Sequence, residues 1–291
     1  MERYKSIIDN WQSFQEECQK HATAAVRKNP LKAGGDFRER LEREFKDLEQ
    51  SGWCDDVYRL PGTEKPGASL LHWRGEYYVQ EESAAIPVET MEPRPGERIL
   101  DMCAAPGGKT TQIAAKMGNE GTVVANDSSE KRLRSLQSNV YRTGAACVAT
   151  TSYDGRSLPE DEKYDRILVD APCSGEGDRA RRTLEAASKD EIENLVKLQK
   201  QLVLKAERLL KPGGTMTYST CTLAPEENEG VVSRLVEETG LELEKIELDL
   251  PHQRGIERFE GKEFGPEMSK TVRVYPHHLN SGAIYVARLT K

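Results

Sequence analysis

Apolar residues near the start of the chain recur at helical spacing. Six of them fall at three- and four-residue steps within residues 2–27, namely Tyr4, Ile7, Ile8, Trp11, Phe14 and Cys18. This spacing predicts one amphipathic helix that ends before Asn29-Pro30. A second helix is predicted at 37–48, followed by short strands at 53–60 and 70–79. We therefore expect residues 1–80 to form a small α/β subdomain.

From residue 81 onward, strand-like and helix-like segments alternate. Strands are predicted at 97–101, 121–126, 146–150, 165–170, 214–219, 241–247 and 283–289. Helices are predicted at 108–117, 129–142, 188–210 and 225–239. This alternation is typical of an α/β fold in which a doubly wound, Rossmann-like sheet has helices on both faces. We expect residues 81–291 to form this domain and to bind ligands at the carboxyl ends of the strands.

Composition narrows the class of protein. The 291 residues hold no run of eighteen apolar residues and begin without a signal peptide, so we expect a soluble, cytoplasmic protein without a membrane partner. The six cysteines form no CxxC pair, which disfavours a disulfide framework and a zinc site. The net charge of −7 requires that any contact with nucleic acid be made through local basic patches.

A loop of small residues follows the first strand of this domain. It runs through Ala104, Ala105, Pro106, Gly107, Gly108, Lys109 and Thr110. Small residues before a helix N-terminus let the backbone approach a nucleotide-like cofactor. A phosphate-binding P-loop would need glycine five positions before Gly108, where this chain has Cys103.

Two acidic residues after the next strands are candidates for the same cofactor. Asp127 lies about twenty residues beyond the glycine turn, where a carboxylate can bind ribose hydroxyls. Asp154 either binds an adenine amino group or forms a turn before Gly155. The spacing fits NAD and S-adenosylmethionine, and the late turn at 211–214 with the final strand favours a methyltransferase.

Two cysteines occupy equivalent places at strand ends. Cys173 follows Val169-Asp170-Ala171-Pro172, and Cys221 follows Tyr218-Ser219-Thr220. Carbon 5 of cytosine is a poor nucleophile until a thiolate adds to carbon 6, and a loop at a strand end can activate such a thiolate. Either cysteine qualifies from the residues alone. Asp170 is placed to contact the base edge and support ring nitrogen 3.

Predictions also follow for three further groups of polar residues. The cluster of Arg179, Arg181 and Arg182 is predicted to bind RNA phosphates, with Arg27, Lys28, Lys32, Lys270 and Arg273 extending the track. Glu226 and Glu227 are assigned to the first turn of a helix as structural residues. His277 and His278 are expected to point apart, and no metal is predicted.

With these motifs in order, the chain resembles the Sun (NOP/Sun) family of RNA cytosine-C5 methyltransferases from about Leu31 onward. The resemblance is carried by segment 78–87, by Ala-Ala-Pro-Gly-Gly-Lys-Thr at 104–110, by Asp-Ala-Pro-Cys-Ser-Gly at 170–175 and by Tyr-Ser-Thr-Cys-Thr at 218–222. Segment 273–286 is similar to the closing segment of the family, with Ala-Ile-Tyr replacing the more usual Gly-Phe-Phe. The arginine-rich stretch after Glu176 departs from the family pattern.

The resemblance implies roles that spacing leaves open. Cys221 is then the attacking thiol, and Cys173 assists the breakdown of the covalent adduct, although DNA cytosine-C5 methyltransferases use a Pro-Cys cysteine as nucleophile. The cofactor is S-adenosylmethionine, held by residues 104–110, Asp127, Asp154 and Asp170, with Arg132 as a weaker candidate. Lys109 is expected to reach the cytosine or Asp170. The N-terminal part is similar to an RNA-recognition-like subdomain.

This reading predicts a monomeric enzyme that makes 5-methylcytosine in RNA. tRNA is the favoured substrate, because the short chain resembles the compact archaeal tRNA enzymes, and ribosomal RNA is second. An amino-methyltransferase is the first alternative, but it would have an aromatic residue at position 173 and no use for two thiols. The other alternative is a non-catalytic RNA-binding factor, against which both cysteines and Asp170 argue.

Overall fold

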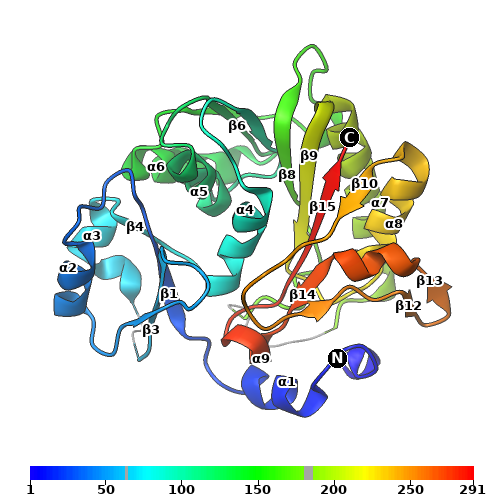
Figure 1. Cartoon of the computed structure of the whole chain (residues 1–291), viewed down its shortest axis with the longest axis horizontal. Coiled ribbons are helices and arrows are strands. Elements are labelled where there is room, and N and C mark those ends of the chain that lie inside the picture. Colours follow the sequence, from blue (N-terminus) through cyan, green and yellow to red (C-terminus); the bar gives the residue numbers. More distant parts are fainter. Residues whose placement is uncertain (63–64, 180–185) are drawn as a thin grey trace.

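A computed structural model of the chain describes residues 1–62, 65–179 and 186–291, which fold around a small and a large sheet (Figure 1). The small sheet is antiparallel and has the order β2-β3-β1-β4. Its strands are β1 (Ala24–Lys28), β2 (Glu49–Gln50), β3 (Val57–Leu60) and β4 (Tyr77–Val79). Its helices are α2 (Phe37–Glu44), α3 (Leu70–Trp73) and the 3-10 helix η2 (Pro66–Ala68).

The large sheet is mixed and has the order β11-β14-β15-β9-β8-β5-β6-β7, with β10 also pairing with β15. The five strands from β7 to β9 are parallel, and β15 and β14 continue the sheet in antiparallel sense. Its strands are β5 (Arg98–Asp101), β6 (Thr122–Asn126), β7 (Val148–Thr151), β8 (Tyr164–Asp170), β9 (Leu210–Thr220), β10 (Glu242–Glu244), β11 (Gln253–Arg254), β14 (Val272–Val274) and β15 (Ile284–Thr290). A separate hairpin is formed by β12 (Arg258–Phe259) and β13 (Lys262–Glu263).

Helices cover both faces of this sheet, as Figure 1 shows. One face carries α4 (Ile86–Met91), α5 (Gly108–Lys116) and α6 (Glu130–Thr143), and the other carries α7 (Lys189–Leu209) and α8 (Glu229–Thr239). The remaining helices are α1 (Trp11–Cys18), α9 (Pro276–Leu279) and the 3-10 helices η1 (Glu2–Tyr4), η3 (Glu82–Ala85), η4 (Gly155–Ser157) and η5 (Pro266–Lys270). The expected doubly wound architecture is confirmed. Among the described helices, none is long and apolar enough to cross a membrane.

Alternating side chains of the parallel strands enter two different cores. Leu100 and Ile167 pack on the side of α7, while Ile99 and Leu168 pack on the side of α4 and α5. A strand buried on both faces reads as a continuous apolar run, which is why these strands were predictable. The predicted strand at 241–247 was too long, since β10 covers Glu242–Glu244.

The single helix predicted for residues 2–27 is wrong. The chain turns at Asn10, whose side chain accepts a hydrogen bond from Ser13 N and begins α1 as a new helix. Tyr4, Ile8 and Phe14 are buried as the spacing suggested, but against the core of the large sheet. Residues 24–28 form β1, which pairs with β3 and β4. The first 18 residues therefore pack away from the small sheet that follows them.

Arg27 of β1 joins the small sheet to α5. Its guanidinium is buried and donates to Gly108 O at 2.9 Å, Thr111 Oγ1 at 3.0 Å and Gln112 Oε1 at 3.2 Å. Burial lowers its pKa to about 10. The predicted phosphate-binding role for Arg27 is wrong, because the side chain is enclosed between the small sheet and α5.

Candidate active site

The ends of β8 and β9 bring two thiols together. The two strands are parallel neighbours, and Asp170 lies opposite Ser219 in their register. Cys173 and Cys221 follow these positions, and their Sγ atoms lie 3.4 Å apart. The loop after Cys173 returns to β9, where Gly177 N donates to Cys221 O at 2.9 Å. A Cβ at position 177 would lie 2.8 Å from Cys221 O, so this close approach requires glycine.

Asp170 and Lys109 form an ion pair beside the thiols. Lys109 comes from the first turn of α5, and its Nζ lies 2.7 Å from Asp170 Oδ2. The second oxygen of Asp170 accepts from Ser219 Oγ at 2.7 Å. Burial lowers the pKa of Lys109. The charge of Asp170 and the hydrogen bond from Lys109 to Asp170 outweigh this effect, so the pKa of Lys109 is raised overall. Lys109 is therefore a permanent cation at this edge of the sheet.

The two thiols have different proton affinities. The pKa of Cys221 is lowered, mainly by the hydrogen bond from Cys173 and also by the charge of Lys109, against burial and Asp170. The pKa of Cys173 is raised by the same hydrogen bond, by burial and by the charge of Glu227. By contrast, burial raises the pKa of Cys18 to about 11 and that of Cys54 to about 12. The arrangement favours a thiolate at Cys221 and a thiol at Cys173.

A cavity of about 240 Å³ lies next to this ion pair. Its walls include five residues of the predicted loop (Ala104, Ala105, Pro106, Gly108 and Lys109), together with Tyr78, Asp101 and Asp170. Gly107 and Thr110 are not on its wall. Gly107 has a φ of 105° and approaches Leu136, and Thr110 Oγ1 donates to Asp101 Oδ2 at 2.7 Å. The cavity therefore has the small-residue rim that the sequence predicted.

Asp101 is a wall residue that the sequence reasoning did not assign to the cofactor. It is 1% exposed, and its Oδ1 has no hydrogen-bond partner among the described residues. Burial raises the pKa of this carboxyl to about 7. Its position at the end of a strand, directly before the small-residue loop, was the available signal. A buried carboxyl oxygen on the wall of this cavity is suited to a ligand that carries a hydrogen-bond donor.

Asp127, predicted to bind the ribose, and Arg132, a weaker candidate for the cofactor, both contact the backbone of the loop. Asp127 is buried and accepts from Ala105 N at 3.2 Å and from Ser129 N at 3.0 Å. Arg132 lies 3.4 Å from Asp127 Oδ2 and also donates to Ala105 O. Their contacts shape the rim of the cavity, and ribose binding by Asp127 stays a prediction.

Asp154 takes the turn-forming role in this structure. It is exposed, begins η4 and pairs with Arg156, whose hydrogen bonds lower the pKa of the carboxyl. It does not line the cavity beside Lys109. Adenine binding by Asp154 therefore rests on the family resemblance alone.

The expected RNA-binding arginines are not an exposed cluster in the described part of the chain. Arg179 has a side chain that is 3% exposed and donates to Asn280 Oδ1 at 3.0 Å and to Glu17 O at 2.9 Å. It thus fastens α1 to the loop beyond Cys173, and its predicted phosphate role is corrected. Arg273 is also buried, paired with Glu229 at 2.5 Å. Arg181 and Arg182 lie outside the described residues.

Glu227 differs from its predicted place in the first turn of a helix. Helix α8 begins at Glu229, and residues 225–228 form a loop that carries Glu227 into the core. Its carboxylate lies beneath the loop that holds Cys173, where it accepts from Ser174 N at 3.0 Å. No spacing signal distinguishes a buried glutamate from an exposed one beside it, so sequence reasoning missed this contact.

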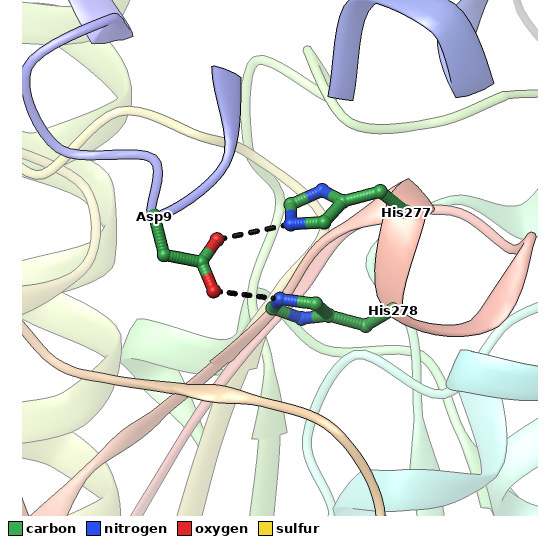
Figure 2. Close-up of side chains that lie close together, drawn as sticks. All are labelled: Asp9, His277 and His278. Atoms are coloured by element: carbon green, nitrogen blue, oxygen red, sulfur yellow. Dashed lines mark hydrogen bonds and ion pairs between the residues drawn. The ribbon is translucent and has the colours of Figure 1, made fainter. Parts of the chain in front are cut away.

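The tandem histidines were wrongly expected to point apart. Figure 2 shows both rings directed at Asp9, with His277 Nε2 at 2.9 Å from Oδ1 and His278 Nε2 at 3.1 Å from Oδ2. His278 Nδ1 accepts from Tyr275 N, which leaves the proton of the neutral ring on Nε2. Metal-bound histidines instead donate from their other nitrogen. The contacts therefore describe a hydrogen-bonded clamp between the N-terminal segment and α9.

The chain is similar to known proteins over nearly its whole length. A family model described as 16S rRNA methyltransferase RsmB/F matches residues 88–290, and one for the N-terminal domain of 16S rRNA methyltransferase RsmF matches residues 1–82. The chain is 37% identical to a tRNA (cytosine(49)-C(5))-methyltransferase of Pyrococcus abyssi, over 100% of this chain and 95% of that protein.

Two further similarities cover most of this chain. It is 36% identical to ribosomal RNA small subunit methyltransferase F of Aliivibrio fischeri, over 94% of this chain but only 59% of that longer protein. The crystal structure of a methyltransferase homolog from Pyrococcus horikoshii superposes with a TM-score of 0.88 at 30% identity, over 100% of this chain and 93% of that one.

Proposed function

Because this chain belongs to the RsmB/F (Sun/NOP) family of RNA cytosine-C5 methyltransferases, we propose that it methylates cytosine in tRNA through a covalent bond between Cys221 and carbon 6. The observation that carries the proposal is the meeting of the two thiols with the Lys109–Asp170 pair, which also lines the adjoining cavity. A nucleophile, a cation and a carboxylate thus share one edge of the sheet. This is the combination that addition to a pyrimidine needs.

Cys221 supplies the nucleophile. Its thiolate adds to carbon 6, forming a carbon–sulfur bond and moving the electron pair of the ring double bond toward carbon 5. Lys109 stabilises the thiolate before attack, since its charge lowers the pKa of Cys221. Asp170 is held by Lys109 and Ser219 at the position expected to face ring nitrogen 3. Carbon 5 then carries the electron density required for bond formation with a methyl group.

Cys173 acts in the second half of the reaction. The proton at carbon 5 leaves to a base, which is Cys173 as thiolate or a water molecule that it binds. The remaining electron pair reforms the ring double bond and expels Cys221 as thiolate. Formation of the carbon–sulfur bond removes the Cys221 thiolate that accepts the hydrogen bond from Cys173, which is the first cause of the raised pKa of Cys173, and the Cys173 thiol can then give its proton to solvent. Cys173 is thereby released for this role after the first bond has formed.

The cavity beside Lys109 fits S-adenosylmethionine. Bound there, this cofactor supplies the methyl group as part of a sulfonium centre. The rim formed by Ala104, Ala105 and Gly108 permits close contact between the backbone and the cofactor. Asp101 Oδ1, which has no hydrogen-bond partner among the described residues, is suited to accept from an amino group. We assign Asp127, with Arg132, to the ribose side of this site, because both contact the backbone of the loop.

tRNA is the substrate that the comparisons favour. The Pyrococcus abyssi relative is named for a tRNA position and aligns with this chain over nearly the whole of both proteins. Ribosomal RNA is the second candidate, since the matched family models and the Aliivibrio fischeri relative are named for ribosomal RNA.

Methyl transfer from labelled S-adenosylmethionine to separated tRNA and ribosomal RNA pools tests the proposal. Nucleoside analysis by mass spectrometry should find 5-methylcytidine in the tRNA pool. The same product in the ribosomal RNA pool alone would replace the substrate class and leave the chemistry standing. Methyl groups on a ring or exocyclic nitrogen would overturn the proposed mechanism.

A further inference from the structure

A buried carboxylate accepts hydrogen bonds from the loop that carries Cys173. Glu227 is 0% exposed, and its two oxygens accept from Ser174 Oγ at 2.5 Å, Ser174 N at 3.0 Å and Gln199 Nε2 at 2.7 Å. Gln199 Nε2 also donates to Pro172 O at 2.8 Å. The residues on both sides of Cys173 are therefore tied to one side chain, directly or through a single glutamine.

The neighbouring glutamate shows that this arrangement is specific to position 227. Glu226 lies on the same loop, but its side chain is 17% exposed and pairs with Arg3 at 2.6 Å. Glu227 is instead tied to side chains of β9 and α7, since the Tyr218 hydroxyl donates to the backbone carbonyl of Glu227 at 2.6 Å and Gln199 of α7 donates to its carboxylate. Two adjacent residues of one type thus have separate surroundings.

Different charged and titratable groups act on the two thiols. Cys173 is faced by Glu227 and Cys221, whereas Cys221 is also faced by Lys109, Asp170 and Asp178. The groups that face Glu227 are Glu176 and Tyr218, together with Cys173. The charge of Glu227 raises the pKa of Cys173, whereas the charge of Lys109 lowers the pKa of Cys221 against the opposing charges of Asp170 and Asp178.

The hydrogen bonds indicate that Glu227 is ionised. Ser174 N and Gln199 Nε2 can only donate, and a carboxylate that accepts such bonds is stabilised in its charged form. Burial raises the pKa of Glu227 above its ordinary value, and the bonds from Ser174 and Gln199 lessen this rise. A buried carboxylate with three donors on it is a fixed negative charge in a region of low dielectric constant.

We propose that Glu227 is a positioning residue that, through Ser174 and Gln199, holds the loop of Cys173 and a negative charge near it for the step that releases the adduct. This inference rests on the proposed function, since it assigns Glu227 to the step that releases the adduct. Without the carboxylate, Cys173 becomes a weaker base in a looser loop. The adduct then forms as before but breaks down slowly.

The first test follows the thiol itself and needs no RNA. In a Cys221→Ser background, the rate of iodoacetamide alkylation at Cys173 is measured against pH by peptide mass spectrometry. Adding Glu227→Gln should lower the midpoint, the pH at which the alkylation rate of Cys173 is half-maximal, by on the order of one unit. Below that pH, this shift corresponds to an increase of about tenfold in the thiolate fraction of Cys173. Glu226→Gln is the matched control and should leave the midpoint in place. A folded Glu227→Gln variant with an unchanged midpoint would overturn the inference.

The second test follows the adduct with Cys221 present. Glu227→Gln should form a protein–RNA adduct whose lifetime on denaturing gels is several-fold longer than that of the unsubstituted protein, and Glu227→Asp should restore most of the turnover. If Glu227→Gln fails to fold, the adduct lifetime is measured in Ser174→Ala instead. This change removes the hydrogen bond from Ser174 Oγ to Glu227 and leaves the charge of Glu227 in place. An adduct lifetime unchanged by Ser174→Ala would then contradict positioning.

The two levels of failure are distinguishable. If the protein makes no 5-methylcytidine, the proposed function fails, and the alkylation profile still reports whether Glu227 controls Cys173. If methylation proceeds normally and neither the profile nor the lifetime responds to Glu227, the inference alone is overturned.

Discussion

Cys173 and Cys221 look alike in sequence, yet their surroundings differ. Both follow a buried strand, and both are partly exposed. The difference comes from side chains of other elements, since Lys109 reaches Cys221 from α5 and Glu227 reaches Cys173 from the loop before α8. Charges brought in from distant positions therefore distinguish two cysteines that their motifs leave alike.

Substitution of each cysteine should give opposite results. Cys221→Ala should lose methyl transfer by on the order of a thousandfold or more and form no adduct, because the attacking thiolate is gone. Cys173→Ala should accumulate an adduct that survives a denaturing gel, because the ring cannot expel Cys221. Gel shift of labelled RNA and methyl transfer measure both effects. Adduct accumulation in the Cys221→Ala protein instead would exchange the two roles.

Among the elements, the N-terminal segment owes its place to a side-chain clamp. Asp9 lies between η1 and α1, and His277 and His278 belong to α9 at the other end of the chain (Figure 2). Phe14 of α1 packs edge-on against Tyr275 and His277 in the same region. Arg179 adds bonds to Glu17 O and Lys20 O at the end of α1. Polar and aromatic contacts together hold this segment on the large sheet.

Loss of the clamp should lower stability measurably. Asp9→Asn should reduce the free energy of unfolding by about 1 kcal/mol, since an amide cannot accept from both rings. Urea unfolding at pH 7.5 measures this, with Glu16→Gln, an exposed change on α1, as the control. Equal stability of the two variants would show that the clamp contributes nothing.

The same clamp should respond to pH. Burial lowers the pKa of His278 below its ordinary value of 6.5, so the folded protein holds the neutral ring where the unfolded chain is already protonated. The unfolded state therefore binds more protons as pH falls through 6.5, and stability should fall with it. Urea unfolding at pH 7.5 and pH 5.5 should show this loss, and His278→Asn should reduce the difference.

At the scale of the whole molecule, the small sheet meets α5 and α6 at the wall of the cavity beside Lys109. Tyr78 of β4 lines the cavity, and its ring is flanked by Arg27 at 5.5 Å and by Arg142 of α6 at 5.7 Å. Arg142 donates to His72 O and Tyr77 O, so each part of the molecule sends one arginine into the other. The small sheet is thus attached where the cofactor is proposed to bind.

Removal of the Arg27 side chain should weaken the attachment of the small sheet to α5 and lower the free energy of unfolding. Arg27→Met keeps the apolar length of the side chain but leaves Gly108 O, Thr111 and Gln112 without their buried donor, at a cost of about 3 kcal/mol in the free energy of unfolding. Lys28→Met, the next residue of β1, should change stability by less than about 0.5 kcal/mol. Urea unfolding of the two variants measures this difference, and similar values would contradict a bridging role for Arg27.

Local patterns were sufficient for the parallel strands of the large sheet and for α5, α6 and α7, but not for α4 or β14. The strands from Arg98–Asp101 to Tyr164–Asp170 were predictable because a buried parallel strand is apolar on both faces. The loop at 104–110 and the two cysteine motifs were recognisable because neighbouring residues create them. That Cys173 and Cys221 meet also followed from sequence, since consecutive parallel strands of this fold end at one edge.

Tertiary structure alone decided which polar residues face solvent. Arg27, Arg179 and Glu227 are charged residues of the kinds usually found at the surface, yet each is enclosed by groups more than twenty positions away in the chain. The same applies to His277 and His278, which converge because Asp9 lies opposite both rings. The periodicity of apolar residues indicates which face of a single helix or strand is buried. Burial of a charge depends on the partners that other elements bring to it, and no local pattern encodes them.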